Sequence, residues 1–137
     1  MCIRDRGCWN SARVEAVEAL LPWAASIAAE SGTGRILVLG DMNAYRKEDP
    51  IRAFRSGGYS ELVEKMSGLP QHSYRFFGQA GTLDYAFASP AMAGNVESAT
   101  IWHINSDWPA RMDLPHPWLR MSDHDPVVVD VRFTGDR

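Results

Sequence analysis

Apolar residues recur at spacings of three and four over the first third of the chain, which is the pattern of an amphipathic helix. Such a helix is predicted to begin at Asn10 or Ser11 and to run toward Glu30. Pro22 lies inside this stretch and predicts a kink or a restart, because an interior proline costs about 3 kcal/mol. The apolar stripe consists of Val14, Val17, Leu21, Ala24 and Ala28.

The pattern then changes to short apolar runs separated by turn residues. Residues 35–39 are almost continuously apolar, which predicts a strand buried on both faces. A short helix is expected over 48–56, with Pro50 in its first turn. Residues 74–77 and 82–88 read as a hairpin joined by 78–81, and 96–104 and 127–133 as further strands. Residues 105–121 are predicted to form a long loop. The mixture of predicted helices and strands gives α/β or α+β, in layers, as the fold class.

Polar groups stand beside three of these strands. Asp41 and Asn43 follow the strand at 35–39, Asp84 lies within another strand, and Asp123 and His124 precede the last one. Taken singly, Asp41 and Asn43 fit turn chemistry and a lone histidine fits a structural role. Taken together, these side chains form the set needed to hold a divalent metal and hydrolyse a phosphoester. An Asp84 carboxylate within a strand needs a partner, and a histidine ring supplies one.

Composition restricts the function without assigning it. The 137 residues correspond to about one domain, with 45% hydrophobic and 23% charged residues. The formal net charge of −3 gives no global basic field to capture nucleic acid, so a phosphate-directed activity needs a metal and local cations. The candidate cations are Arg46, Lys47, Arg52, Arg55 and Arg75, for which solvated surface positions are an equally good explanation. Cys2 and Cys8 leave the compartment undetermined.

Three motifs occur in a specific order: Gly40-Asp41-Met42-Asn43-Ala44, Leu83-Asp84-Tyr85 and Ser122-Asp123-His124-Asp125-Pro126. Together they resemble the endonuclease/exonuclease/phosphatase superfamily, whose fold is deoxyribonuclease I-like. The segment Trp102-His103-Ile104-Asn105 and the stretch from Ser73 to Tyr85 resemble the secreted bacterial nuclease branch of that superfamily.

The resemblance implies a role for each matching residue. Asp41 would orient or deprotonate the attacking water, and Asn43 would hold the scissile phosphate. Asp84 would brace His124, which would act as a general acid or base or as a phosphate ligand. Asp123 would bind the divalent ion, with Mg²⁺ expected and Mn²⁺ or Ca²⁺ as alternatives. His72, His103 and His116 lie outside this pattern, and structural or exposed positions are expected for them.

The superfamily domain is about twice as long, and its first half supplies a metal-binding Glu and a second His that this chain does not match. We therefore expect residues 1–6 to be a non-native lead-in, 7–134 the C-terminal part of one domain, and 135–137 a tail. The implied fold is the C-terminal half of a four-layer α-β-β-α sandwich with mixed sheets. Its partner would be the missing N-terminal half of the same domain, and the isolated fragment is expected to be inactive.

The function implied is a metal-dependent phosphodiesterase, foremost an extracellular endonuclease that hydrolyses DNA, with RNA as a second substrate. The full-length protein would be extracellular or periplasmic, with nucleic acid as substrate and no membrane partner. Two alternatives stay open at this point. One is a phosphoesterase of a lipid or small molecule in the same superfamily, and the other is a remnant domain that retains the site without catalysis.

Overall fold

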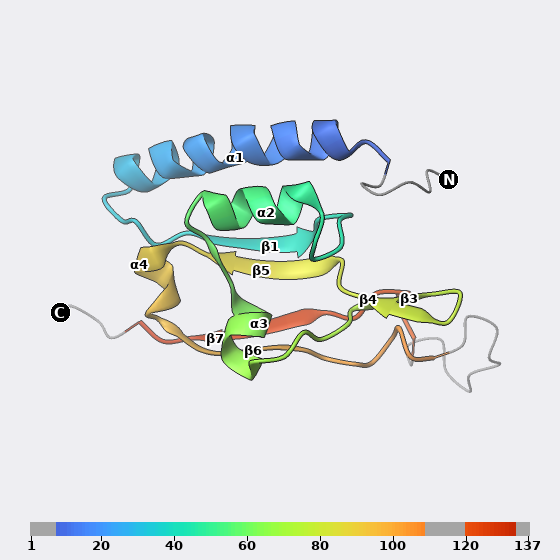
Figure 1. Cartoon of the computed structure of the whole chain (residues 1–137). Helices are drawn as coiled ribbons and strands as arrows, with labels where there is room; N and C mark the ends of the chain where they lie inside the picture. The colour runs from blue at the N-terminus through green and yellow to red at the C-terminus, as the bar shows by residue number, and fades with distance from the viewer. Residues whose placement is uncertain (1–7, 109–119, 134–137) are drawn as a thin grey trace.

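The structure is a computed structural model that describes residues 8–108 and 120–133, and its elements follow one another as in Figure 1. A long helix comes first, and short strands and short helices follow it. The helices are α1 (Asn10–Glu30), α2 (Asp49–Ser56), α3 (Leu62–Ser67) and α4 (Pro90–Ala93). The strands are β1 (Leu37–Asp41), β2 (Ser60–Glu61), β3 (Tyr74–Phe76), β4 (Gln79–Gly81), β5 (Asp84–Ala88), β6 (Val96–Ile101) and β7 (Val127–Val131).

The described strands form one three-stranded sheet and two strand pairs. Strand β5 lies in the centre of the order β1-β5-β2, while β3 pairs with β4 and β6 pairs with β7. All of these pairings are antiparallel. The expected combination of helices and sheets in one α+β fold is therefore confirmed, while the complete four-layer sandwich stays a prediction.

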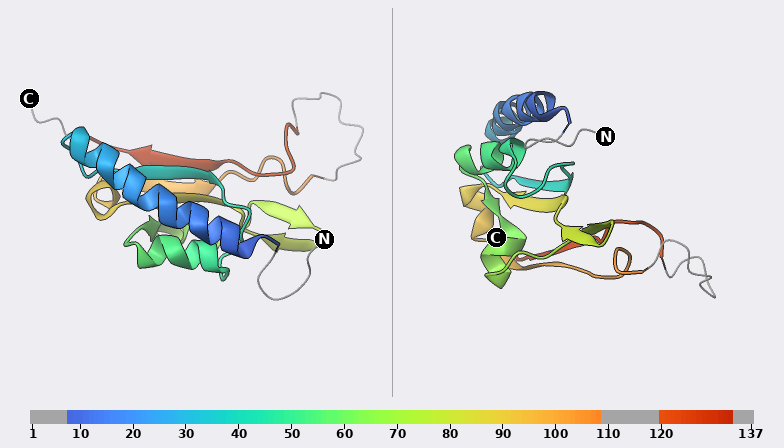
Figure 2. Two further views of the ribbon diagram at one scale, coloured as in Figure 1. Left: turned by 90° about the horizontal axis from the view of Figure 1, so that it is seen from above. Right: turned by 45° about the vertical axis from the view of Figure 1, so that its right-hand side comes forward.

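Strand β5 separates two apolar clusters because successive side chains of a strand point to opposite faces. On one face Tyr85 and Phe87 pack against the helices α1 and α2, through residues that include Val17 and Phe54. On the other face Ala86 and Ala88 pack with α3, α4 and the β6–β7 pair. Figure 1 shows this layering, and the view from above in Figure 2 shows α1 lying over the strands.

Two buried polar side chains fix the short helices. The Glu61 carboxylate accepts hydrogen bonds from the backbone N–H groups of Val63 and Glu64 at 3.0 Å each, which caps α3. The Ser89 hydroxyl accepts from the Met92 N–H at 3.2 Å and from the Ile36 N–H at 3.0 Å. Ser89 therefore caps α4 and also fastens it to the start of β1. Neither α3 nor α4 was expected from the periodicity, because a helix of one or two turns has no measurable stripe.

The hairpin differs from the one that the sequence pattern predicts. Residues 74–77 were expected to pair with 82–88, but β3 pairs with β4 through a two-residue turn at Phe77 and Gly78. Both turn residues have positive φ, 47° and 78°, which is the backbone shape of tight hairpin turns. Because β3 pairs with β4, the strand β5 pairs with β1 and β2 instead.

Strand β1 is not buried on both faces, contrary to the prediction from its apolar run. It pairs with β5 alone among the described strands and so lies at an edge of its sheet. The side chain of Leu39 is 54% exposed, while Leu37 packs into the cluster around Ala86. The helix α1 contains Pro22 without a restart, and its buried residues include Val17 and Ala24 of the predicted stripe. Within the described residues, no helix combines the length and the apolar character that crossing a bilayer requires.

Candidate active site

The last residue of β1 and the first residue of β5 bring two carboxylates together. Asp41 and Asp84 are direct partners in the antiparallel register, so their side chains leave the sheet on the same face. Carboxylates placed directly opposite each other repel, and a cation or a positively charged side chain relieves that repulsion. The pairing therefore makes this end of the sheet a place where positive charge is favoured.

His124 supplies such a group from a distant part of the sequence. Its Nδ1 atom lies 2.8 Å from Oδ2 of Asp84, which confirms the expected contact between the two side chains. Because an ionised carboxylate can only accept, Nδ1 carries the proton and Nε2 is left for chemistry. Partial burial opposes protonation of the ring, but the Asp84 hydrogen bond and the charges of Asp84, Asp41 and Asp123 outweigh it and raise the pKa of His124.

The turn after β1 places Asn43 beside this pair. The backbone N–H of Asn43 donates to Oδ1 of Asp41 at 2.7 Å, and Asn43 adopts a φ of 47°, which asparagine tolerates well. The buried hydroxyl of Tyr85 lies 2.9 Å from the carbonyl oxygens of both Ala44 and Thr82, which share its single proton, and this contact holds the following segment in place. Asp41 thus shapes the turn through one oxygen, and within residues 8–108 and 120–133 no hydrogen bond to its other oxygen is found.

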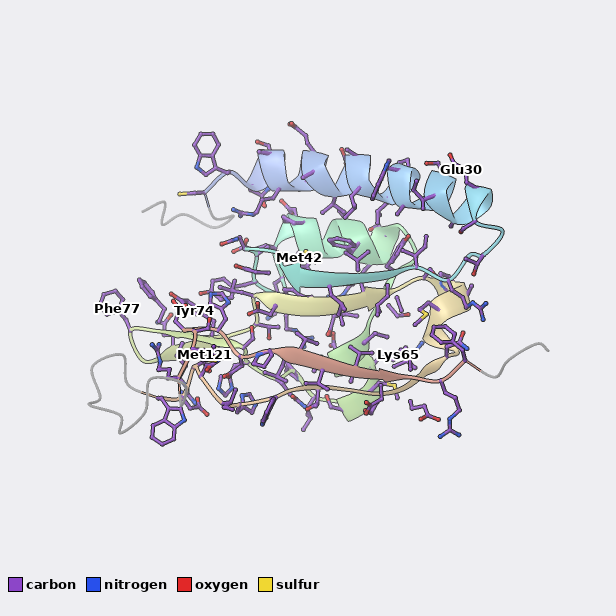
Figure 3. All side chains as sticks on the ribbon, turned by 180° about the vertical axis from the view of Figure 1, so that it is seen from behind. Glu30, Met42, Lys65, Tyr74, Phe77 and Met121 are labelled. Atoms are coloured by element: carbon purple, nitrogen blue, oxygen red, sulfur yellow. The ribbon has the colours of Figure 1, made fainter. Side chains whose placement is uncertain are left out.

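A cavity of about 300 Å³ opens where these segments meet. It has polar groups and aromatic rings in its wall, and the Tyr74 ring lies 4.6 Å from the His124 ring between their centroids. The lining residues are Asn43, Tyr45, Tyr74, Phe76, Leu83 and His124. Figure 3 shows Tyr74 at the end of the molecule where the hairpin emerges.

Ser73 ties the two halves of the site together, and the sequence pattern gave no reason to select it. Its side chain is fully buried, and its hydroxyl accepts from the N–H groups of Leu83 and Asp84 at 3.0 Å each. Its carbonyl accepts from the N–H of Asp125 at 2.7 Å. The Asp84 segment and the His124 segment are therefore positioned by the same residue.

Asp125 is a second positioning residue that sequence reasoning did not assign. It is 1% exposed, and its Oδ1 accepts from the backbone N–H groups of Ile104, Asn105 and Ser106 at 3.1, 2.7 and 2.8 Å. Its Oδ2 accepts from the Ser106 hydroxyl and faces His103 Nδ1 at 3.0 Å. Burial opposes ionisation, but these donors outweigh it and lower the pKa of Asp125 to about 2. The only signal for this role in the sequence was an aspartate directly before Pro126, at the start of the last apolar run.

The loop held by Asp125 also contacts the catalytic candidate directly. The side-chain amide of Asn105 donates to the His124 carbonyl at 2.7 Å. Asn105 is itself buried, and its N–H belongs to the group of donors around Asp125. Hydrogen bonds therefore hold the backbone at His124 and at Asp125 before any ligand binds.

Two groups of side chains among the described residues have ligand atoms close enough to share a metal ion. In the first, the ligand atoms of Asp41, Asp84 and His124 all lie within 4.8 Å of one another. Two carboxylates suit a hard cation such as Mg²⁺, which binds through one or two carboxylates and the substrate phosphate. Asp123 is exposed beside this group but does not belong to it, so its assignment as the metal ligand stays a prediction.

The second group consists of His72, His103 and Asp107. Asp107 accepts from Arg75 and lies 2.9 Å from His72 Nε2, and these contacts lower its pKa. The charge of Asp107 is thus already balanced by Arg75, and His103 is bound to Asp125. These contacts brace the loop that carries Asn105. The structural positions expected for His72 and His103 agree with this geometry, and His116 lies outside the described residues.

Most of the candidate cationic side chains form ion pairs with carboxylates. Arg46 and Arg55 both pair with Glu64, and Arg52 lies 3.5 Å from Asp49. Arg75 pairs with Asp107, as described above. For the remaining candidate, Lys47, no ion pair is found in the described part of the chain, and it is exposed. Lys47 lines a second cavity of about 490 Å³, which shares Tyr45 with the first.

Comparisons with known proteins identify one matching family and solved structures with a similar fold. The sequence model of the Endonuclease/Exonuclease/phosphatase family matches residues 9–124. A 3′-5′ exonuclease, NExo, from Neisseria meningitidis has a similar structure, with a TM-score of 0.60 and 15% identity over 85% of this chain. A second structure, the 3′ phosphatase NExo from Neisseria bound to a product DNA hairpin, has a TM-score of 0.58 and 14% identity over 85% of this chain.

These likenesses concern the fold, because the identities are low. The chain spans 52% of the length of each of these two solved structures, or about half. No curated protein matches the chain by sequence.

Proposed function

The chain belongs to the endonuclease/exonuclease/phosphatase family, and from this we propose that it forms part of a metal-dependent phosphodiesterase that cleaves DNA. We further propose that the enzyme is an extracellular or periplasmic endonuclease, in line with the resemblance of Trp102-His103-Ile104-Asn105 and its neighbours to secreted bacterial nucleases. The observation that carries the proposal is the contact between His124 and Asp84, made opposite Asp41 at one end of the sheet.

His124 is the proton-transfer group in this proposal. Asp84 accepts the hydrogen bond from Nδ1–H, which fixes the ring and leaves Nε2 free of Asp84, and His124 lines the cavity. The raised pKa of His124 favours the protonated ring, so the ring can donate a hydrogen bond to a phosphate oxygen or a proton to the leaving oxygen. A positioned group of this kind contributes about 10²- to 10⁴-fold to a rate.

Asp41 and Asn43 act on the other reactants. One oxygen of Asp41 accepts from the Asn43 N–H, and the second is available to orient an attacking water. Asn43 lines the same cavity as His124, and its side-chain amide would donate to the scissile phosphate. The residues that would hold a divalent ion are Asp41 and Asp84, with Asp123 as the ligand that the family pattern suggests. Bound there, Mg²⁺, Mn²⁺ or Ca²⁺ would stabilise negative charge on the phosphate.

DNA is preferred over a lipid or small-molecule phosphoester for one reason. The similar NExo structure is described as bound to a product DNA hairpin, which supports nucleic acid as the substrate class. RNA stays a second nucleic-acid substrate of the same proposal. The net charge of −3 implies that binding depends on local contacts and on the metal.

The experiment compares three substrates in the presence of Mg²⁺: closed circular DNA, a 3′-phosphorylated oligonucleotide, and a choline phosphodiester. Because the chain spans about half of the similar solved structures, it is assayed alone and together with the N-terminal half of a relative. Nicking of the circle, abolished by EDTA and weakened by salt, is the expected result. Release of phosphate or single nucleotides without nicking would refute the endonuclease assignment. Turnover of the choline phosphodiester alone would refute nucleic acid as the substrate.

A further inference from the structure

Three aromatic side chains line the β3–β4 hairpin next to the candidate active site. The Tyr74 and Phe76 rings are stacked, with centroids 6.2 Å apart and an interplanar angle of 17°. Phe76 and Phe77 meet edge to face at 4.5 Å. The row begins at the His124 ring, 4.6 Å from Tyr74, and ends at Phe77, which Figure 3 shows at the outer end of the hairpin.

Turn chemistry does not account for Phe77. The tight turn requires positive φ at both Phe77 and Gly78, and asparagine, aspartate or glycine normally occupies the first of these positions. A bulky side chain with this backbone conformation is an outlier, and such strain concentrates at functional sites. An asparagine at position 77 would form the same turn without the strain.

Core packing does not account for Phe77 either. Its side chain is 88% exposed, and Phe76, its ring partner, is itself 42% exposed. Exposed aromatic rings that are contiguous and next to a cavity indicate a binding surface rather than a folding requirement. The hairpin therefore presents apolar, planar surface to solvent at the edge of the site.

The cavity beside the hairpin joins this surface to the phosphate-directed groups. Tyr74 and Phe76 form one side of its lining, while Asn43 and His124 contribute the polar part. The neighbouring base of a nucleic acid whose phosphate lies at His124 could therefore reach the Tyr74 ring, whose centroid is 4.6 Å from that of His124. Planar bases stack on aromatic rings without sequence preference, because each base has a π-face.

We propose that Tyr74, Phe76 and Phe77 form a stacking platform for unpaired nucleobases that flank the scissile phosphate. The platform makes single-stranded or frayed DNA the preferred ligand, because bases in a duplex are already stacked on one another and gain nothing from it. This inference rests on the proposed function and adds the form of nucleic acid that the site accepts. Each stacked base is expected to raise the affinity about 5- to 150-fold.

The test measures binding to the chain complemented with the N-terminal half of a relative, by fluorescence anisotropy, with EDTA present so that nothing is cleaved. Two labelled oligomers of equal length are compared, one of single-stranded DNA and one in which every nucleotide is abasic. The abasic oligomer keeps the phosphates and removes the bases. The wild-type chain is expected to bind the DNA oligomer at least 5-fold more tightly than the abasic one.

Phe77→Asn is the informative variant, because asparagine suits the turn and the substitution therefore does not threaten folding. It should lower the preference for bases severalfold while leaving affinity for the abasic oligomer unchanged. Phe133→Ala is the matched control, since Phe133 is also exposed but contacts Arg35, outside the row of rings that starts at His124. This variant should keep the wild-type preference.

The outcomes separate the two proposals. Equal affinity of the wild-type chain for both oligomers would overturn the platform and leave the proposed function standing. Binding to neither oligomer would also overturn the platform, because stacking of bases on aromatic rings needs no metal, while the proposed function is tested separately by Mg²⁺-dependent cleavage. A preference that Phe77→Asn and Phe133→Ala reduce equally would also overturn the platform, because the effect would then not belong to the hairpin. A labelled duplex of the same sequence is measured alongside the two oligomers, and tighter binding to this duplex than to the single strand would overturn the stated form of the ligand.

Discussion

Nδ1 of His124 and Oδ2 of Asp84 lie 2.8 Å apart, although 40 positions separate the two residues in the sequence. The contact is held by the backbone on both sides. Ser73 accepts from the Asp84 N–H and also receives the N–H of Asp125, the residue that follows His124. The pair is therefore part of the fold, and its geometry exists before a substrate or a metal arrives.

The first prediction concerns the protonation of His124. Replacing Asp84 by Asn removes the negative charge and leaves only a neutral amide oxygen as acceptor, so the pKa of His124 should fall. Asp41→Asn removes only a more distant charge and should lower the pKa by less. A proton NMR titration of the His124 ring in the three proteins measures both effects. An unchanged pKa in Asp84→Asn would show that the contact does not form in solution.

The same pKa shift has a consequence for stability. A group whose pKa is raised by folding binds its proton more tightly in the folded state, so it stabilises the fold at low pH. The contribution of His124 should be complete below the unfolded value of about 6.5 and should be lost as the pH rises through the folded pKa. Thermal melts of the wild type and of His124→Ala should therefore differ in their pH dependence within that window.

The second prediction concerns Asp125, the buried acceptor that holds the loop around Asn105. Asp125→Asn replaces a carboxylate oxygen by an NH₂ group among donors, and we expect it to lower the free energy of unfolding by about 2–4 kcal/mol. Asp123→Asn is the matched control, because Asp123 belongs to the same short segment but is exposed. Urea denaturation of both variants provides the measurement, and equal stabilities would contradict the role assigned to Asp125.

Acid denaturation gives an independent check of Asp125. Its pKa is lowered to about 2 in the folded state, so it contributes stability above the unfolded value of about 3.9. That contribution should disappear as the pH falls from about 4 toward 2. The Asp125→Asn variant should lack this part of the acid transition, and Asp123→Asn should retain it.

The sequence pattern selected four residues that the fold brings together, but it did not select the residues that hold them in position. Asp41, Asn43, Asp84 and His124 could be selected because acidic, amide and imidazole groups beside strands form recognisable motifs. Ser73 and Asp125 act through backbone hydrogen bonds, and which N–H group meets which acceptor depends on the register of strands that are distant in sequence. Periodicity cannot supply that register.

The secondary structure was likewise predicted where the pattern is local and missed where it depends on pairing between distant strands. The stripe that contains Val17 and Ala24 predicted α1 because a long amphipathic helix repeats its pattern many times. The hairpin was misplaced because Gly78 and Gly81 are both turn residues, and only pairing between strands decides which one closes the turn. Strand β1 was expected to be covered on both faces, since its composition does not reveal whether a neighbouring strand is present.

The third prediction follows from the exposed edge of β1. Leu39 is 54% exposed on a strand with one described neighbour, and such edges associate with other chains. We expect the isolated chain to form oligomers or aggregates, and Leu39→Lys to increase the monomer fraction in size-exclusion chromatography with light scattering. Leu69→Lys is the control, because Leu69 is 70% exposed but lies outside the strands. A wild-type chain that elutes as a monomer, or a monomer fraction that Leu39→Lys and Leu69→Lys raise equally, would contradict this expectation.

The most direct measurement of the proposed activity is the rate of DNA cleavage by His124→Ala compared with His72→Ala. The two histidines are closely matched, since each pairs with an aspartate, at 2.8 and 2.9 Å, and their side chains are similarly exposed. In the chain complemented with the N-terminal half of a relative, His124→Ala should lose at least about 10²-fold in Mg²⁺-dependent turnover while DNA binding is largely kept. His72→Ala should cleave at close to the wild-type rate. Wild-type turnover by His124→Ala would contradict the assignment of the active site to the His124–Asp84 pair.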